Sequence, residues 1–155
     1  MDEPHKNQTQ NRRAIIDVGS NSVKLLIADV VDGVVMPLTH KGEQTRLGQG
    51  VFETGQLASE AIEATARVVA DFAAKAKGQG VASVRVLATS ATREAANGDE
   101  LAAAISAGGL ELEIIDGQTE AELVLRGVRS LPDLAEGPLA IIDVGGGSTE
   151  LIVAD

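Results

Sequence analysis

One hexapeptide, Ala-Ile-Ile-Asp-Val-Gly, occurs at residues 14–19 and again at residues 140–145. Each copy is apolar up to its aspartate, and each leads into a short segment of small and polar residues before a second apolar run begins. Two apolar runs of this length around a Gly-containing break are typical of a β-hairpin. The chain is therefore predicted to build the same strand, turn and strand twice.

The similarity extends beyond the hexapeptide. Without gaps, residues 14–29 align with residues 140–155, and the alignment also matches a serine, a leucine and an aspartate. The two copies start 126 residues apart (140 − 14), which is too long for a solenoid repeat and suits a duplicated domain. We therefore expect residues 14–136 to form a first domain and residues 137–155 to be the opening hairpin of a second, truncated domain.

Composition narrows the expected partners of the chain. Aromatic residues make up 1% of the sequence, so the core must consist of Val, Ile, Leu and Ala. The formal charge of −10 disfavours DNA and anionic membranes as partners. A small polyanion could still be held by a few fixed donors in one cleft. The absence of cysteine excludes disulfides and thiolate chemistry.

The first residues carry no recognisable targeting signal. Residues 1–13 are polar and lack the apolar segment of a signal peptide, and no later run is long enough to cross a membrane. We expect a disordered tail at residues 1–13 and a cytoplasmic protein. His5 and His40 lie apart in the sequence, and we interpret each as an incidental surface residue.

Three β-rich runs open the chain after this tail. Short breaks containing Gly separate the runs, which are Ala14–Val18, Val23–Val31 and Val34–Leu38. Strands joined by short turns pair antiparallel. We expect a three-stranded meander, followed by a loop over residues 41–54.

The rest of the chain alternates helix and strand. Apolar residues recur every three or four positions from Ile62 to Ala76, which predicts a helix that Gly78 ends. The elements expected next are a strand at 84–88, a helix capped by Asp99 and reaching Ser106, a strand at 112–115, a helix at 120–129 and a strand at 139–143. Alternating strands and helices imply parallel crossovers. We predict an α/β fold whose mixed sheet starts as an antiparallel meander and continues as βαβ units, with helices on both faces.

The two turns are candidate phosphate sites. Small residues after a strand leave backbone N–H groups open to an anion. The candidates are Gly19, Ser20, Asn21 and Ser22 in the first turn and Gly145, Gly146, Gly147 and Ser148 in the second. Either turn alone could be an ordinary hairpin turn. Its repetition after an aspartate favours a site that grips phosphate from two sides.

Charged residues flank both turns. Asp17 and Asp143 occupy equivalent strand ends, where a carboxylate can bind Mg²⁺ directly or through water. For Asp17 the alternative is a carboxylate that accepts N–H groups of the turn. Lys24 in the first copy corresponds to Glu150 in the second, so facing copies would offer one cation and one carboxylate. The alternative for Lys24 is a solvated strand residue.

Two further candidates follow other predicted strands. Glu120 falls in the first turn of a helix, where the helix dipole favours the ionised form, and an ionised carboxylate can deprotonate a water. Arg93 ends a run rich in hydroxyl residues and could clamp a phosphate. The alternatives are a purely structural acid at a helix start for Glu120, and a surface pair of Arg93 with Glu94.

These residues resemble the motifs of the exopolyphosphatase and guanosine pentaphosphate phosphatase (Ppx/GppA) family, a branch of the actin, hexokinase and chaperone ATPase superfamily. The resemblance is collinear over nearly the whole chain from Ala14. The motifs are residues 17–22 (Asp-Val-Gly-Ser-Asn-Ser), 46–48 (Arg-Leu-Gly), 88–93 (Ala-Thr-Ser-Ala-Thr-Arg), 117–121 and 142–150. The resemblance implies a ribonuclease H-like, actin-like ATPase domain.

The resemblance also implies a function. The protein would be a Mg²⁺-dependent phosphohydrolase that releases terminal phosphate from inorganic polyphosphate or from guanosine pentaphosphate. Its binding partners would be polyphosphate or guanosine penta- or tetraphosphate. Glu120 would activate water, Asp143 and Glu150 would help to hold the metal, and the two turns with Arg93 would hold phosphate. The active cleft of this superfamily lies between two domains, so we expect the isolated chain to be inactive or nearly so.

Two departures from the family pattern bear on the substrate. Thr119 stands where an acid is frequent, and Glu122 stands where a basic residue is frequent. Long polyphosphate could therefore be a poor substrate, or its affinity could come from parts that this chain lacks. A homodimer could also form through such parts. Two other functions remain open on the same fold, namely a non-catalytic nucleotide or alarmone sensor and an ATP-binding domain like that of sugar and acetate kinases.

Overall fold

The computed structural model describes residues 11–134 and 136–155, so His5 and the first ten residues of the predicted tail lie outside the described residues. The last two residues of that predicted tail, Arg12 and Arg13, form the start of a strand. Nε of Arg12 lies 2.8 Å from Oδ1 of Asp29 in a half-buried ion pair on the neighbouring strand. The prediction of a tail reaching residue 13 is therefore wrong at its end, because a specific charge pair fixes Arg12.

The predicted mixed sheet is present. Its five strands are β1 (Arg12–Val18), β2 (Ser22–Val31), β3 (Val34–Gln44), β4 (Ser83–Ala88) and β5 (Leu112–Ile114). The first three pair antiparallel, and β4 and β5 add in parallel, which gives the order β3-β2-β1-β4-β5. β3 extends to Gln44 because it stays paired with β2 up to Ser22. The loop predicted from residue 41 therefore begins later.

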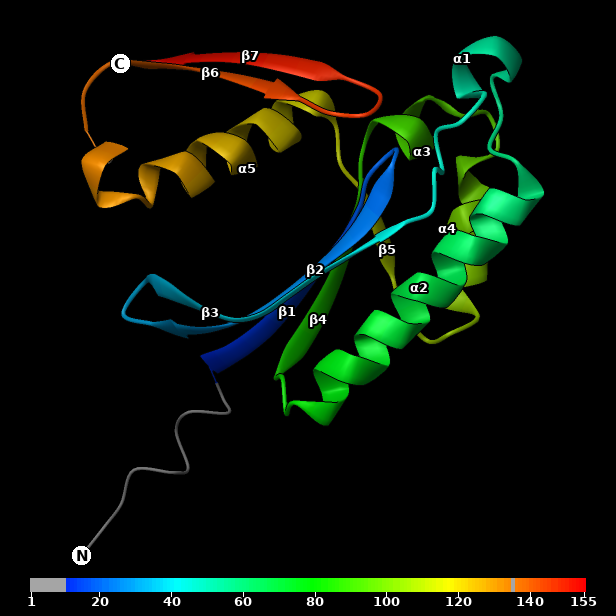
Figure 1. The fold of residues 1–155 in the computed structure, drawn as a ribbon, viewed down its shortest axis with the longest axis horizontal. Helices are drawn as coiled ribbons and strands as arrows, with labels where there is room; N and C mark the ends of the chain where they lie inside the picture. Colours follow the sequence, from blue (N-terminus) through cyan, green and yellow to red (C-terminus); the bar gives the residue numbers. More distant parts are fainter. Residues whose placement is uncertain (1–10, 135) are drawn as a thin grey trace, which may run out of the picture.

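Helices lie on both faces of this sheet (Figure 1). The helical elements are α1 (Val51–Thr54), α2 (Ser59–Gly78), α3 (Ser90–Glu94), α4 (Gly98–Ser106), α5 (Gly117–Arg129) and the 3₁₀ helix η2 (Pro132–Leu134). In Figure 1, α2 and α4 lie on one side of the sheet and α5 lies on the other. None of the described helices is long and apolar enough to span a membrane. The α/β fold class predicted from the sequence is confirmed.

One predicted cap is wrong. Residue Asn97, not Asp99, occupies the N-cap position of α4, and Asp99 lies in the first helical turn. The side chain of Asn97 makes no capping bond. Instead it accepts a hydrogen bond from the N–H of Leu57 at 2.8 Å and donates one to the carbonyl of Leu57 at 3.1 Å. A contact between two residues 40 positions apart in the sequence thus holds the start of this helix.

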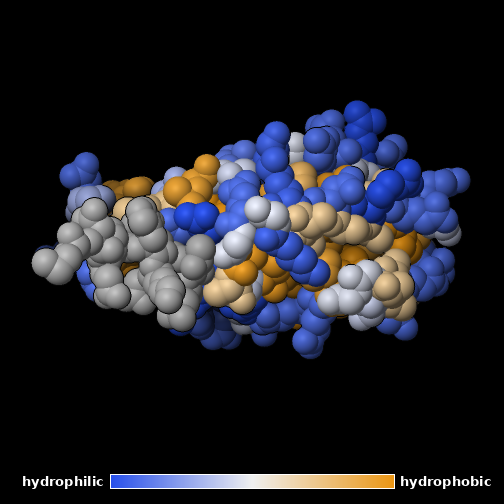
Figure 2. Space-filling model, turned by 90° about the horizontal axis from the view of Figure 1, so that it is seen from below, coloured by the Kyte–Doolittle hydropathy of each residue, from blue (hydrophilic) through white to orange (hydrophobic). Residues whose placement is uncertain are grey.

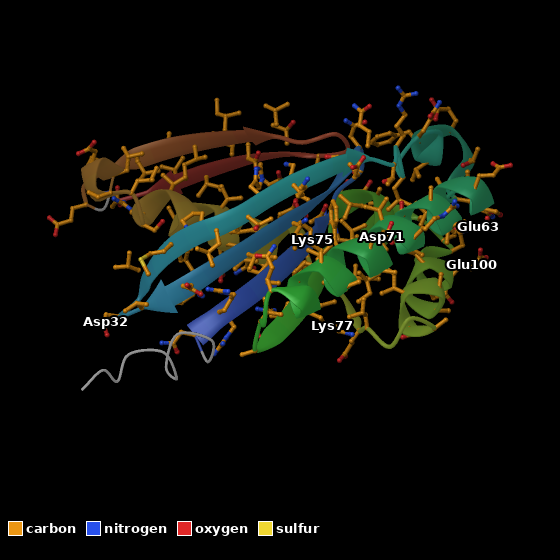
Figure 3. All side chains as sticks on the ribbon, turned by 60° about the horizontal axis from the view of Figure 1, so that its bottom comes forward. Asp32, Glu63, Asp71, Lys75, Lys77 and Glu100 are labelled. Carbon is orange, nitrogen blue, oxygen red and sulfur yellow. The ribbon has the colours of Figure 1, made fainter. Side chains whose placement is uncertain are left out.

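The core lies between α2 and the sheet. Alternate strand residues point to the same face of a sheet, and those facing α2 are fully buried, namely Ile16, Val18, Val23, Leu25 and Ile27. The helix contributes Val69, Ala73 and Ala76 at the spacing that the sequence predicts, together with Thr65 and Phe72. Its labelled charged side chains, Glu63, Asp71, Lys75 and Lys77, are exposed (Figure 3). This packing fixes the ends of β1 and β4 relative to each other.

The last two strands, β6 (Leu139–Val144) and β7 (Thr149–Ala154), form a separate antiparallel sheet. β7 packs against α5 (Figure 1). Ile152 is buried there, whereas Ile142, Val144, Leu151 and Val153 on the outer face are exposed. Apolar side chains also remain visible among polar ones when the molecule is seen from below (Figure 2). A separate sheet accords with a boundary near residue 136, and that boundary stays a prediction.

Candidate active site

The two repeated hairpins have the same turn geometry. The N–H of Gly19 donates to the carbonyl of Ser22 at 3.1 Å, and the N–H of Gly145 donates to the carbonyl of Ser148 at 2.9 Å. Asp17 stands opposite Lys24 in the β1–β2 pair, and Asp143 stands opposite Glu150 in the β6–β7 pair. The sequence repeat therefore corresponds to a repeat of backbone structure, with one difference in charge.

The second turn lies directly on the first. A Cβ atom at Gly147 would lie 2.5 Å from Oγ of Ser20 and 2.8 Å from Oγ of Ser90. A Cβ atom at Gly146 would lie 3.2 Å from Cβ of Asn21. At distances under 3.0 Å, the hydroxyl groups of Ser20 and Ser90 would have to shift to admit a side chain at Gly147. Gly146 and Gly147 thus let the second turn approach the first closely.

A cavity of about 160 Å³ opens between the two turns. Every predicted turn residue lines it, namely Gly19, Ser20, Asn21, Ser22, Gly145, Gly146, Gly147 and Ser148. Asp17, Glu120 and Asp143 line it as well. The tertiary structure thus brings together groups from β1, α5 and β6. Asp17 and Asp143 line the same cavity although they lie more than 100 residues apart in the sequence.

Four residues outside the predicted set of site residues also line this cavity, namely Lys24, Thr89, Ser90 and Val144. Thr89 and Ser90 follow β4, and Lys24 faces the cavity from β2. The run of hydroxyl residues after a parallel strand was a usable signal for Thr89 and Ser90, since ligands gather at such strand ends. Lys24 acts on Asp17 electrostatically, so the interpretation of Lys24 as only a solvated residue is too weak.

Glu120 is held at the start of α5. Its N–H donates to the carbonyl of Asp116 at 2.9 Å, and the Asp116 side chain accepts the N–H of Thr119 at 2.7 Å as the helix cap. Burial raises the pKa of Glu120; the charges of Glu150 and Asp17 act in the same direction, and the hydrogen bond from Arg93 opposes them. The predicted position in the first turn is confirmed. Burial acts against the ionised form that the helix dipole favours.

Arg93 lies behind Glu120 and not on the lining of the cavity. Its Nη1 donates to the carbonyl of Ile115 at 2.9 Å and lies 3.2 Å from Oε2 of Glu120. Its Nη2 is 4.0 Å from Oε1 of Glu94. The interpretation of Arg93 as a partner of Glu94 alone therefore misses its shorter ion pair. A role of Arg93 in clamping phosphate stays a prediction.

The carboxylates that line the cavity are candidate ligands of Mg²⁺. Burial raises the pKa of Asp17, Lys24 lowers it and Asp143 raises it. Among residues 11–134 and 136–155, no group of three or more acidic or histidine side chains is arranged as a metal site. Mg²⁺ commonly binds through only one or two carboxylates, with waters and substrate phosphates as its other ligands. The carboxylates of Asp17 and Asp143, which repel each other across one cavity, fit this mode of binding. Glu150 does not line the cavity.

Comparison with known proteins identifies the family. The model of the "Ppx/GppA phosphatase family" matches residues 26–155. The chain belongs to the Ppx/GppA phosphatase family. Exopolyphosphatase 2 of Mycobacterium tuberculosis is 39% identical to this Ppx/GppA chain over 156 aligned residues, which cover 93% of this chain and 48% of the relative.

Solved structures of the family have the same fold. The crystal structure of the Aquifex aeolicus Ppx/GppA family member superposes with a TM-score of 0.81 at 35% identity, over 92% of this chain and 47% of that one. An exopolyphosphatase from Cytophaga hutchinsonii gives a TM-score of 0.86 at 31% identity, over 93% of this chain and 46% of that one. This Ppx/GppA chain thus spans about half the length of the relatives it matches.

Proposed function

We propose that the protein is a Mg²⁺-dependent phosphohydrolase that releases the terminal phosphate of inorganic polyphosphate, with guanosine pentaphosphate as a second candidate substrate. One observation carries this proposal. A partly buried carboxylate, Glu120, lines the same small cavity as two Gly-rich turns and is held by Arg93. The family match supports phosphatase chemistry. A guanidinium behind a carboxylate keeps it oriented toward the space where a water and a phosphate would meet.

The chain's own residues account for most of the proposed mechanism. The backbone N–H groups of the two turns hold the phosphate oxygens. Glu120 accepts a proton from water, and the water oxygen attacks the terminal phosphorus. The bond from that phosphorus to the bridging oxygen breaks, which releases orthophosphate and a chain shortened by one phosphate. A raised pKa brings Glu120 closer to neutral pH, where a carboxylate is a better base.

Asp17 and Asp143 are the residues that would hold Mg²⁺ in this proposal, whereas Glu150, the third ligand expected from the sequence, does not line the cavity. The bound cation would neutralise charge on the phosphate oxygens of substrate and transition state. Asp17 and Asp143 belong to different hairpins, so one cation between them would join the two walls of the site. A cytoplasmic location, an active cleft between duplicated domains and near-inactivity of the isolated chain remain predictions from the sequence.

The test is phosphate release by the full-length protein with each substrate, with and without Mg²⁺. Glu120→Gln keeps the shape of the side chain but removes the base, and it should lower kcat by roughly 100-fold or more while binding is retained. Glu63→Gln, on the exposed face of α2 (Figure 3), is the matched control. Binding without any release by the unmodified protein would favour a sensor, and transfer of phosphate from ATP to an acceptor would favour a kinase.

A further inference from the structure

A second cavity, of about 390 Å³, lies against the outer side of the same turns. It shares Ser20, Asn21 and Gly146 with the smaller cavity that contains Glu120. Its remaining lining residues are Arg46, Gly48 and Gln49. A substrate with several linked groups could therefore occupy both cavities at once, because the two cavities adjoin at the first turn.

The two cavities differ in charge. The smaller one is lined by three carboxylates and one lysine. The larger one is lined by no carboxylate, and Arg46 is the one charged residue among its lining residues. The others offer amide, hydroxyl and backbone groups. In a chain with a formal charge of −10, a cavity of this composition favours an anion over a cation.

Arg46 is fixed to the first turn through the backbone. The N–H of Arg46 donates to the carbonyl of Asn21 at 3.0 Å, and the N–H of Gly48 donates to the carbonyl of Ser20 at 2.7 Å. A Cβ atom at Gly48 would lie 3.0 Å from Cβ of Ser20, so the loop and the turn are in close contact. The position of Arg46 is therefore set by the same turn that lines the smaller cavity.

The guanidinium of Arg46 has no partner among residues 11–134 and 136–155. Arg12, Arg85 and Arg93 all form ion pairs with carboxylates, whereas no ion pair or side-chain hydrogen bond involves Arg46 in the described part of the chain. Its backbone has a φ of 50°, which is uncommon for a residue other than Gly. An arginine in this state has its hydrogen-bonding capacity available for a ligand.

We propose that Arg46 binds a phosphate of the substrate upstream of the one that is hydrolysed, and so selects substrates that carry several linked phosphates. The proposal rests on the proposed function and adds a specificity-determining residue to it. A guanidinium presents paired N–H donors that match two oxygens of a phosphate, and the amides of Asn21 and Gln49 add donors nearby. The shared chemistry is a phosphoanhydride chain, whether inorganic or attached to guanosine.

The test compares Arg46→Gln and Arg46→Lys with Arg67→Gln in the full-length protein. Arg67 lies exposed on α2 with no ion pair among the described residues, so its variant changes the net charge equally at a remote place. Steady-state kinetics with pyrophosphate, polyphosphates of increasing length and guanosine pentaphosphate give KM and kcat separately. Binding of the same compounds is measured in a Glu120→Gln background, where turnover is removed.

Arg46→Gln should raise KM and weaken binding roughly tenfold or more for long substrates, with little change in kcat. Its effect on pyrophosphate should be smaller, because pyrophosphate has only one phosphate beyond the one that is released. Arg46→Lys should retain part of the affinity that Arg46→Gln loses. Arg67→Gln should bind these substrates as tightly as the unmodified protein. A loss for polyphosphate alone or for guanosine pentaphosphate alone supports the proposal and identifies the source of the phosphate. Unchanged KM and binding at every length, or an equal loss in Arg67→Gln, overturns it.

Failure of this proposal is distinguishable from failure of the proposed function. If neither the unmodified protein nor its variants release phosphate, but long polyphosphate binds in a way that depends on Arg46, the hydrolase assignment fails and the binding site stands. If Glu120→Gln abolishes release while Arg46→Gln behaves like the unmodified protein, the hydrolase assignment stands and the role of Arg46 is refuted. Thermal unfolding of each variant shows whether a loss reflects misfolding, and Arg46→Lys then supplies the decisive comparison.

Discussion

Nη1 of Arg93 lies 3.2 Å from Oε2 of Glu120, and the same nitrogen donates to the carbonyl of Ile115 at 2.9 Å. Arg93 lies in the last turn of α3, and Glu120 lies in the first turn of α5. The pair therefore joins two elements that follow adjacent parallel strands. Both side chains are largely covered, at 25% and 16% exposure, so the interaction is less screened by water than a surface pair.

Removal of Arg93 should change the pH dependence of the reaction. The hydrogen bond from Arg93 lowers the pKa of Glu120, against the raising effect of burial. Without it the pKa rises further, and because Glu120 acts in its deprotonated form, activity should be lost at a higher pH as the solution is acidified. In Arg93→Gln we expect kcat to fall roughly tenfold near neutral pH, with partial recovery at higher pH.

The pH profile of kcat measures this shift directly. Arg85→Gln removes a surface ion pair with Glu113 and should leave the profile unchanged. An Arg93→Gln enzyme whose profile keeps its midpoint but loses activity equally at all pH values would show that Arg93 acts only on substrate or on folding.

Replacement of Asp17 should raise the stability of the fold and lower the activity. Burial raises the pKa of Asp17 in the folded protein, so the folded state binds this proton more tightly than the unfolded chain. The stabilising effect of that proton is present at low pH and is lost as the pH rises through the folded pKa. At neutral pH, where the residue is ionised, Asp17→Asn should therefore stabilise the fold by roughly 1 kcal/mol while it lowers activity.

Thermal unfolding from acidic to neutral pH checks this prediction. The gain from Asp17→Asn should shrink in acid, where the native carboxyl is already protonated. Asp29→Asn is an instructive contrast, because Arg12 lowers the pKa of Asp29, and its removal should destabilise the protein at neutral pH. A loss of stability in Asp17→Asn at neutral pH would mean that Asp17 makes a required contact as an anion.

A side chain at Gly147 should disturb the contact between the two turns. A Cβ atom there would meet Oγ of Ser20 and Oγ of Ser90 at 2.5 and 2.8 Å, so Gly147→Ala should push the two turns apart. We expect it to lower phosphate release at least tenfold by misplacing the groups that hold phosphate. Combining it with Ser20→Ala and Ser90→Ala tests whether space is the cause, through recovery of substrate binding.

Gly127→Ala is the matched control. Gly127 lies within α5, and a Cβ atom there would meet nothing within 4 Å. Alanine in a helix is favoured over glycine by roughly 0.5–1 kcal/mol, so this variant should be neutral or more stable. Equal activity of Gly147→Ala and Gly127→Ala would show that the side chains of Ser20 and Ser90 make room without loss of function.

The proposed metal ligands should respond to the Mg²⁺ concentration. Chelation of divalent ions should abolish phosphate release and leave the fold intact, because the described core is apolar and independent of these carboxylates. Asp143→Asn should require a higher Mg²⁺ concentration for half-maximal release, whereas Asp99→Asn on α4 should not. Full activity in the presence of a chelator would refute the metal requirement.

The antiparallel meander and the crossovers could be predicted because alternation of period two and apolar spacing of three to four are local properties of the chain. The ends of the strands and helices were harder to predict from the sequence. β3 runs on to Gln44 because its partner β2 is there to pair with it, and α1 and α3 are too short to show a period. Asn97 begins α4 through a contact with Leu57, which no local pattern announces.

The sequence by itself determined the repeated hairpin, the turn residues and the candidate acid Glu120, since a repeat and a Gly-rich break depend only on neighbours in the chain. Only the tertiary structure decided that Arg93 pairs with Glu120, that burial raises the pKa of Glu120, and that Arg46 lines a separate cavity. Ion pairs, desolvation and cavities depend on groups far apart in the chain that folding brings within a few ångströms, and charge energies change steeply over that range.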